Sequence, residues 1–470
     1  DSVSKKMDSK KKPNAGEAET RFVEMLSLLA QDKVEEATAK AKAALEAGLP
    51  TGRLVAGPHD LLSKLPAFPE AESIDLVHGP MLGNVTTESV SIWVRTRAAA
   101  DVTVKSGEVE AKVRTKAENH FAAVAEMQGL SADTEYELQV LVDGKPVDGA
   151  MATFRTPPAL GNPRPFSVVF GGGAGFIPEW ERMWDTIRAR KPLAFFTLGD
   201  NVYIDDPEHP LTQHYCYSRR QSRPEWRRLV ASTPVYSIWD DHDFALNDCV
   251  PGPTIDKPAW KRDVWNVYRQ NWANPAYGGG EVTPGCWYDF HLGDVHFMML
   301  DGRIYRDLKG GSMLGDVQKK WLKEALTGSK ATFKVIATPV PFSPNIKPGS
   351  KDTWDGFADE RAEIFSWIRD SEIDGVFLIS ADRHRTDLRT IENPDSYTLY
   401  EFQSSKLTNK HTHPVVKTDG LIWGYNKTCS FGLMHFDTTL DDPQVKFELV
   451  DIDGEVHEDH ILRLSDLKAP

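Results

Sequence analysis

The sequence predicts a layered α/β domain that is preceded by a small β-sandwich and an N-terminal helical segment. Apolar residues recur at helical spacing near the N-terminus, polar and apolar residues alternate between about 76 and 157, and short apolar runs alternate with helical segments from 165 onward. The chain has 470 residues, which allows two or three domains at roughly 100–200 residues each. We therefore divide it into residues 1–75, 76–160 and 161–470.

The first segment is expected to combine a disordered arm with amphipathic helices. Residues 1–19 are charged and nearly free of large apolar side chains, which is typical of disorder. Apolar residues at helical spacing occupy residues 17–47, and Gly48 and Pro50 end the pattern. We expect one or two helices there that pack on the main body as an appendage.

The second segment alternates polar and apolar residues as half-buried strands do. The pattern is clear at residues 89–95, 101–105 and 136–142, and turn signals at 143–144 and Gly149 accompany these runs. We expect a small β-sandwich of roughly 80 residues.

The third segment alternates buried strands with helices. The apolar runs that predict strands are residues 166–170, 193–198, 235–239, 295–300, 334–338 and 375–380. The segments that predict helices between them are residues 180–189, 317–325 and 359–369. Alternation of this kind indicates layered α/β architecture, in which ligands bind at the carboxyl ends of the strands.

Polar side chains follow four of the predicted strands. In chain order, these side chains are Asp200 and Tyr203, then Asp241, His242 and Asn247, then Asp301 and Arg303, and finally Asp382 and His384. One Asp after a strand is usually a helix cap or a turn residue, but four strand ends together favour a metal site. Carboxylate, amide, phenol and imidazole groups suit Fe, Mn, Ca, Mg or Zn.

Five motifs extend this pattern in a characteristic order. They are GDNVY (199–203), WDDHDFALN (239–247), LDGRIYR (300–306), DTWDGFADER (352–361) and SADRH (380–384). In order and spacing they resemble the PhoD-like alkaline phosphatases and phosphodiesterases of the purple-acid-phosphatase-like metallophosphatase superfamily. The resemblance covers about residues 76–470. It implies an α-β-β-α catalytic domain behind an immunoglobulin- or fibronectin-like sandwich.

The resemblance also implies a set of metal ligands and their ions. Asp200 would bridge the metals and Tyr203 would bind a ferric ion. The expected cofactors are Ca²⁺, with or without Fe³⁺, while Mn²⁺, Mg²⁺ or Zn²⁺ would also suit the ligands. The ligands carried over are Asp200, Tyr203, Asp241, Asn247, Asp382 and His384.

A glycine run departs from the family pattern. In PhoD-like enzymes the first catalytic strand ends in a Cys that binds ferric iron, whereas here it ends in FGGGAGF at residues 170–176. The run could be an anion cradle of backbone N–H groups or a tight turn. We expect any iron to be bound without sulfur. The cysteines, which fit either one disulfide or four free thiols, are Cys216, Cys249, Cys286 and Cys429.

A second Asp-x-His sequence lies at residues 293–296 and has the textual form of the family motif. It stands at the start of a strand rather than at the carboxyl end of the last one. We expect Asp294 and His296 to share one face of that strand without binding metal.

The ligand set predicts a hydrolysis in which a metal-activated hydroxide attacks the phosphorus of a phosphate mono- or diester. His242 could protonate the leaving alkoxide, or could be a structural histidine bonded to Asp240 or Asp243. Arg303 could hold a phosphate oxygen, or could form a salt bridge with the surrounding carboxylates. The alternative function is a non-catalytic cell-surface or polymer-binding protein on a decayed site, a reading that the absent Cys keeps open.

The overall charge and hydropathy weigh against nucleic acid and membranes as partners. The chain has 55 Lys and Arg against 69 Asp and Glu, a net charge of −14, which weighs against a nucleic-acid-binding surface. No apolar run approaches the roughly 18 residues of a membrane span.

The chain begins at Asp1, which would fit removal of a signal peptide and predicts a secreted or periplasmic protein.

Overall fold

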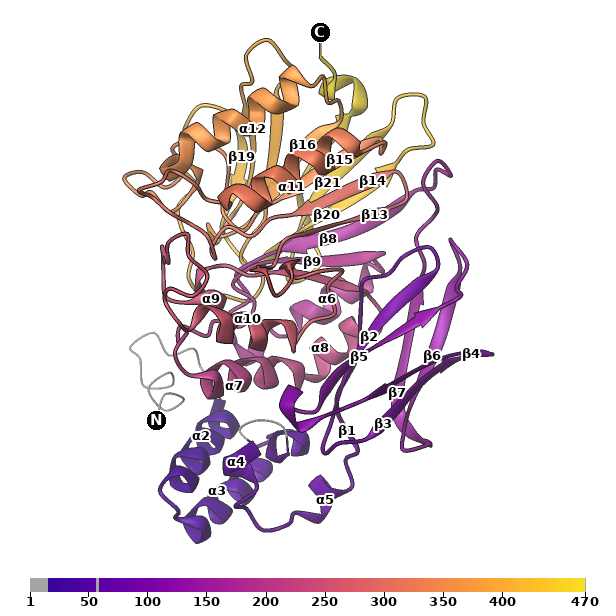
Figure 1. Ribbon diagram of the computed structural model, residues 1–470, viewed down its shortest axis with the longest axis vertical. Helices are drawn as coiled ribbons and strands as arrows, with labels where there is room; N and C mark the ends of the chain where they lie inside the picture. Colours follow the sequence, from indigo (N-terminus) through magenta and orange to yellow (C-terminus); the bar gives the residue numbers. More distant parts are fainter. Residues whose placement is uncertain (1–15, 56–58, 470) are drawn as a thin grey trace.

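The computed structural model describes residues 16–55 and 59–469, and the part of the predicted arm at residues 1–15 lies outside them. Figure 1 shows an N-terminal group of helices, a β-sandwich beside it and a larger layered domain. Residues 16–19, which the sequence assigned to the arm, belong to the first helix.

Two helices, α2 (Gly16–Ala30) and α3 (Val34–Glu46), form a pair at the N-terminal end. Their packing follows from the apolar period, because Phe22, Met25 and Leu29 are fully buried. The elements that follow them are η1 (Thr51–Leu54), α4 (His59–Leu62) and α5 (Pro69–Glu72).

A buried ion pair ties this helical group to helix α7 (Pro210–Gln221) of the layered domain. The Arg53 guanidinium lies 2.8 Å from Ser218 Oγ and 3.1 Å from Glu19 Oε2. Glu19 also accepts a hydrogen bond from the Tyr215 hydroxyl at 3.0 Å. The helices are therefore an appendage packed on the main body.

Residues 76–155, all of which are described, form two antiparallel sheets packed as a sandwich. The first sheet has the order β1 (Leu76–Gly83), β2 (Ser89–Thr96) and β5 (Ala122–Gln128). The second has the order β4 (Val109–Arg114), β3 (Asp101–Ser106), β6 (Glu135–Val142) and β7 (Lys145–Arg155). The apolar residues of the alternating pattern point inward and are buried, among them Ile92, Val104 and Val140.

Residues 161–469 are all described, and their strands form two large sheets and one small hairpin. One large sheet has the order β10 (Val235–Ile238), β9 (Ala194–Leu198), β8 (Phe166–Gly171), β20 (Ser430–Asp437), β21 (Gln444–Asp451) and β22 (Val456–Arg463). The other has the order β13 (Tyr288–Leu292), β14 (Val295–Met299), β15 (Phe333–Ala337), β16 (Val376–Ser380), β18 (Leu399–Gln403), β17 (Thr386–Ile391) and β19 (Leu421–Tyr425). The hairpin pairs β11 (Gly278–Gly279) with β12 (Thr283–Pro284).

The main core lies between the two large sheets. Phe196 on β9 packs against Phe297 on β14, and Phe402 on β18 packs against Phe447 on β21, each pair with ring centroids 4.8 Å apart. Aromatic rings from facing sheets thus interdigitate, which buries apolar surface from both.

Helices cover the outer faces of the sheets (Figure 1). Trp184 of α6 (Met183–Ala189) packs on Phe195 of β9 with ring centroids 6.1 Å apart. Trp321 of α11 (Gly315–Gly328) donates to Asp289 on β13 at 3.2 Å. Besides α7, the other α-helices of this domain are α8 (Pro224–Val230), α9 (Asp241–Phe244), α10 (Lys261–Arg269) and α12 (Ala358–Asp370), and its 3-10 helices are η3 (Pro178–Trp180), η4 (Trp354–Phe357) and η5 (Leu464–Leu467). This arrangement is the α-β-β-α layering that the family resemblance implied.

The carboxyl ends of parallel strands meet at one edge of the layered domain. Strands β8, β9 and β10 run parallel, as do β14, β15, β16 and β18. The loops that follow them therefore gather the polar motifs at that edge.

All four cysteines are free thiols. Within the described ranges, none of the helices has the length and apolar character that a membrane crossing requires.

Candidate metal centre

The loop after β9 turns sharply to present Asp200. Gly199 has a φ of +98°, and a Cβ there would lie 2.5 Å from Cβ of Asp240. Only glycine allows this close approach of the loops after β9 and β10. Asp200 and Tyr203 then adopt the left-handed region, at φ values of +55° and +52°. Such backbone strain in non-glycine residues is concentrated at functional sites.

A buried carboxylate holds this strained loop in place. Asp243 accepts hydrogen bonds from the backbone N–H groups of Asn201 and Val202 at 2.8 and 2.9 Å. Burial and the nearby Asp200 charge raise the pKa of Asp243 to about 7. In the other direction, the His242 carbonyl accepts from the N–H of Ile204 at 2.7 Å. The motifs GDNVY and WDDHD therefore build one unit.

Three strand ends bring predicted site residues together. Carboxylate oxygens of Asp200 and Asp241, both predicted ligands, lie within 4.8 Å of each other and of a ring nitrogen of His242, the predicted proton donor. His384 joins from the end of β16, with its Nε2 2.8 Å from the Tyr203 hydroxyl and 3.7 Å from Asp200 Oδ2. Sequence-distant carboxylates, a phenol and imidazoles thus share one site.

The environment of Asp200 fits a bound cation. Its Oδ1 is buried and, within the described residues, accepts no hydrogen bond. Burial raises the pKa of Asp200 to about 7, and the charges of Asp241 and Asp382 add to the rise while His242 opposes it. A buried carboxylate oxygen without a donor is costly unless a positive charge lies beside it. The donor set therefore suits metal ions.

His384 presents a neutral imidazole to this site. Its side chain is buried, and burial lowers the pKa of His384 to about 4. The neutral ring is the form that binds metal. Its Nδ1 is also buried and has no hydrogen-bond partner within the described part of the chain.

Asp382 and Asn247 are placed less directly. The Asp382 carboxylate lies 3.2 Å from the Arg383 guanidinium. Burial alone would raise the pKa of Asp382, but the positive charges of Arg383 and Lys347 outweigh it and lower that pKa. Asn247 is exposed. Both residues stay predicted ligands.

His242 is held by a partner that the sequence did not indicate. Its Nδ1 is bonded to Asp205, rather than to Asp240 or Asp243. Burial would lower the pKa of His242, but Asp200, Asp205 and Asp241 outweigh burial and raise that pKa to about 10. The ring is therefore an imidazolium that donates its Nδ1–H to Asp205.

Arg303 is enclosed by carboxylates. The side chain is fully buried, pairs with Asp240, and lies 2.7 Å from Asp352 and 3.7 Å from Asp241. This arrangement favours the salt bridge that the sequence left open as the alternative to phosphate binding. Through these ion pairs Arg303 holds the Asp240–Asp241 segment in position.

Replacing Arg303 with Ala is expected to lower the free energy of unfolding by about 3–5 kcal/mol, because Asp240 and Asp352 would stay buried without their partner. Denaturant unfolding measures this loss. Arg262→Ala is the matched control, since Arg262 pairs with Asp256 at the surface and should cost no more than about 1 kcal/mol. An Arg303 variant that unfolds like the wild type but has a raised KM would instead assign Arg303 to the substrate.

The glycine run is a tightly packed turn rather than an anion cradle. Three of its backbone N–H groups are already used, since Gly172, Gly173 and Ala174 donate to the carbonyls of Ser404, Gly199 and Asp200. Gly173 has a φ of +68°, and a Cβ there would lie 3.1 Å from Cδ2 of His384. The glycine run thus packs directly against the His384 ring.

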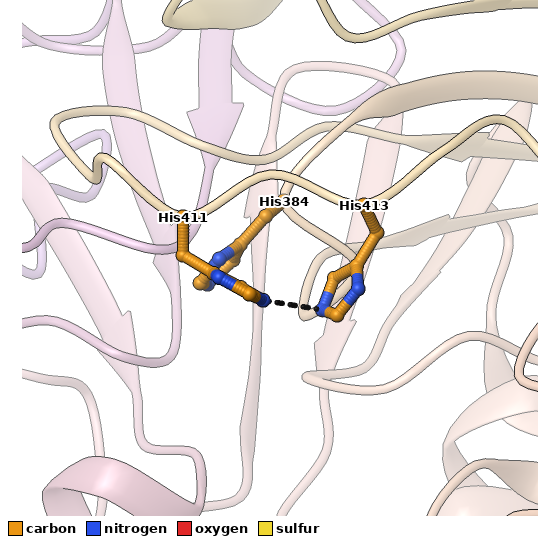
Figure 2. A group of neighbouring side chains, drawn as sticks. All are labelled: His384, His411 and His413. Carbon is orange, nitrogen blue, oxygen red and sulfur yellow. Dashed lines mark hydrogen bonds between the residues drawn. The ribbon is translucent and has the colours of Figure 1, made fainter.

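Two further imidazoles lie at this site, and the sequence analysis missed them. Figure 2 shows His411 and His413 facing His384. The three residues each offer a nitrogen within 4.8 Å of the others. The signal that could have found them is the His-Thr-His spacing, because residues i and i+2 of an extended chain share a face.

One further group of possible ligands is accounted for by protein contacts. Asp241, Asp248 and Asp352 lie together, but Lys347 is 2.8 Å from Asp248 and 3.0 Å from Asp352, and Arg303 completes the neutralisation.

The second Asp-x-His sequence is likewise occupied. Asp294 accepts from the N–H of Gly161 at 2.6 Å, and His296 is bonded to Asp289 on the neighbouring strand at 2.9 Å. Asp294 precedes β14 and His296 lies within it.

Comparisons with known sequences match two parts of the chain. A family model described as "PhoD-like phosphatase" matches residues 168–437, and one described as "Domain of unknown function (DUF7800)" matches residues 73–158. Alkaline phosphatase D of Bacillus subtilis (strain 168) is 23% identical over an alignment of 234 residues, and the match covers 43% of this chain and 40% of that protein. The chain therefore spans less than half of this relative in the matched stretch.

Two solved structures share the predicted layered fold and confirm it. The structure of PhoD has a TM-score of 0.71 and 16% identity, and the match covers 85% of this chain and 90% of that one. A purple acid phosphatase from yellow lupin (Lupinus luteus) seeds has a TM-score of 0.59 and 12% identity, over 83% of this chain and 75% of that one. Because the family model also matches more than half of its residues, the chain belongs to the PhoD-like phosphatase family.

Proposed function

We propose that this protein is a metal-dependent hydrolase of phosphate mono- or diesters. The observation that carries the proposal is the buried, unpartnered Oδ1 of Asp200 among the described residues, beside Asp241, Tyr203 and His384. Membership of the PhoD-like phosphatase family supports it. The non-catalytic alternative has no such support, because a decayed site would have no need to gather these ligands in strained backbone.

The ligands would be Asp200, Tyr203, Asp241 and His384, with Asp382 and Asn247 proposed from the sequence. When bound there, metal ions would lower the pKa of a bound water and offset the charge of the phosphate. Ca²⁺, with or without Fe³⁺, is proposed for this set. Arg303 and Asp243 hold the two ligand-bearing loops in position.

His242 would serve as the proton donor. Its imidazolium lies beside Asp200 and Asp241, packs on Tyr203 with ring centroids 4.7 Å apart, and is oriented by Asp205. Protonation of a leaving alkoxide by a positioned imidazolium contributes about 10²–10⁴-fold to a rate. The ring also carries positive charge toward the place where phosphate charge would lie.

His242→Gln should lower kcat for phosphoester hydrolysis by about 100-fold or more while metal content stays at the wild-type level. Assays with an aryl phosphate monoester and an aryl phosphate diester would measure the loss and rank the two substrate classes. His209→Gln is the control, because His209 makes a similar Asp pair at the surface, 2.7 Å from Asp206. A wild-type protein that holds metal but cleaves neither ester would contradict the proposed function.

A secreted or periplasmic location is part of the same proposal, as the place where phosphate is acquired from external esters. Fractionation of the producing cells, followed by detection of the chain, would test it. Recovery with the cytoplasmic fraction would contradict it.

A further inference from the structure

The loop between β18 and β19, residues 404–420, crosses the edge where the metal centre lies. Ser405 forms a bridge with Gly172, and the N–H of Leu407 donates to the Gly172 carbonyl at 2.9 Å. The Thr408 hydroxyl donates to the Gly175 carbonyl at 2.6 Å. This loop is therefore bound along the glycine run that supports His384.

Further contacts hold the His-Thr-His sequence of the loop above His384. Between the two histidines, the Thr412 hydroxyl lies 3.1 Å from the His384 carbonyl and 3.3 Å from the Asn426 carbonyl. The Asn426 side chain in turn donates to the His413 carbonyl at 3.0 Å. The backbone of the imidazole pair is thus positioned against the residue that ends the last catalytic motif.

The three rings face one another closely. His411 Nε2 and His413 Nε2 form a hydrogen bond at 3.2 Å, and the His384 ring centroid lies 5.4 Å from that of His411 and 5.9 Å from that of His413 (Figure 2). Two nitrogens that bind one zinc ion at about 2.0–2.1 Å in tetrahedral geometry are about 3.3 Å apart. The distance between the Nε2 atoms of His411 and His413, called the outer pair below, therefore matches the distance between two nitrogen ligands on one ion.

We propose that His411 and His413 bind a first-row transition-metal ion of the Zn²⁺ type together with His384. This inference deepens the proposed function and rests on it, because it names the ion at one position of the same centre. The ligand set predicted from the sequence contains one imidazole, that of His384, among oxygen ligands, and it therefore favoured Ca²⁺. Three imidazoles change the preference, since nitrogen ligands suit zinc, iron and similar ions, whereas Ca²⁺ takes oxygen.

The proposed centre contains two groups of ligands that differ in chemical type. Asp200 and Asp241 supply carboxylate oxygens in one group of neighbouring side chains, and the β18–β19 loop supplies two imidazoles in the other. His384 belongs to both groups, because it contacts Tyr203 and also lies with the outer pair. No cysteine joins any ligand group within the described residues, so nitrogen would be the softest donor available.

The test compares the full chain with a double variant, His411→Ala/His413→Ala. Metal-free protein is titrated separately with Zn²⁺ and Ca²⁺ in a calorimeter, and the zinc-loaded protein is studied by X-ray absorption at the zinc edge. We expect the double variant to bind Zn²⁺ at least about 10–100-fold more weakly, with little change for Ca²⁺. The absorption spectrum should lose the outer-shell scattering of two imidazoles.

His435→Ala is the matched control, because His435 is a surface histidine on β20 that lies 3.3 Å from Glu448. It should bind both ions as the wild type does. An unchanged zinc affinity and imidazole number in the double variant would overturn the inference.

The two proposals can fail separately in this design. A wild-type protein that binds zinc through three imidazoles but cleaves no phosphoester supports the metal inference and contradicts the function. A wild-type protein that cleaves esters while the double variant keeps its zinc and its spectrum contradicts the metal inference alone. Melting temperatures of both variants show whether any loss of zinc comes from unfolding.

Discussion

Exhaustive chelation is expected to abolish phosphoester hydrolysis and to lower the melting temperature of the protein. The activity falls because Asp200, Asp241 and His384 then have no ion to present to the phosphate. The stability falls because an ion present at about 1,000 times its Kd contributes about 4 kcal/mol to the folded state. Removal also leaves the buried carboxylate of Asp200 uncompensated.

The measurement is the hydrolysis rate and the thermal transition before chelation, after verified metal removal, and after each ion is returned. Ca²⁺, with or without a transition metal, is expected to restore the rate. Restoration that requires Zn²⁺ or iron would also support the imidazole site. Full activity in protein shown by elemental analysis to be free of metal would rule out metal dependence.

His384→Ala is expected to remove most of the activity and to lower metal content. His384 is the side chain that contacts the Tyr203 hydroxyl, lies near Asp200 and faces the β18–β19 loop. Loss of such a ligand should weaken metal binding by at least about 100-fold. Elemental analysis of the purified variant measures this loss independently of any assay.

His296→Ala provides the contrast, because it comes from the other Asp-x-His sequence. His296 is bonded to Asp289 and stacks on His291 with ring centroids 4.0 Å apart. The substitution is therefore expected to lower the free energy of unfolding by about 1 kcal/mol and to leave the metal content unchanged. If the His296 variant lost metal and the His384 variant kept it, the site would have been assigned to the wrong strand.

Much of the fold could be predicted from local patterns. The runs at residues 166–170, 193–198 and 375–380 became β8, β9 and β16 almost without change, because a short apolar run bounded by polar residues reports burial on both faces. The motif GDNVY was also informative, since Gly199 must be glycine where two loops meet. Motifs that follow such strands then had to share one edge of the sheets.

Side-chain partners could not be predicted in the same way. The sequence offered His242 a bond to Asp240 or Asp243, and the structure gives it Asp205. It left Arg303 between substrate and salt bridge, and the folded chain encloses it among carboxylates. Both outcomes depend on how loops far apart in the sequence are packed, which no local period records.

The sequence by itself determined the layered α/β class, the strand ends and the chemical types of the ligands, because these depend on periodicity and on residue identity. Only the tertiary structure decided which groups share the centre. It used the N–H groups of the glycine run within the protein, and it brought His411 and His413 to His384 from a loop with no regular structure. The physical reason is that a metal centre is selected by distance and burial, and both are properties of the packed chain.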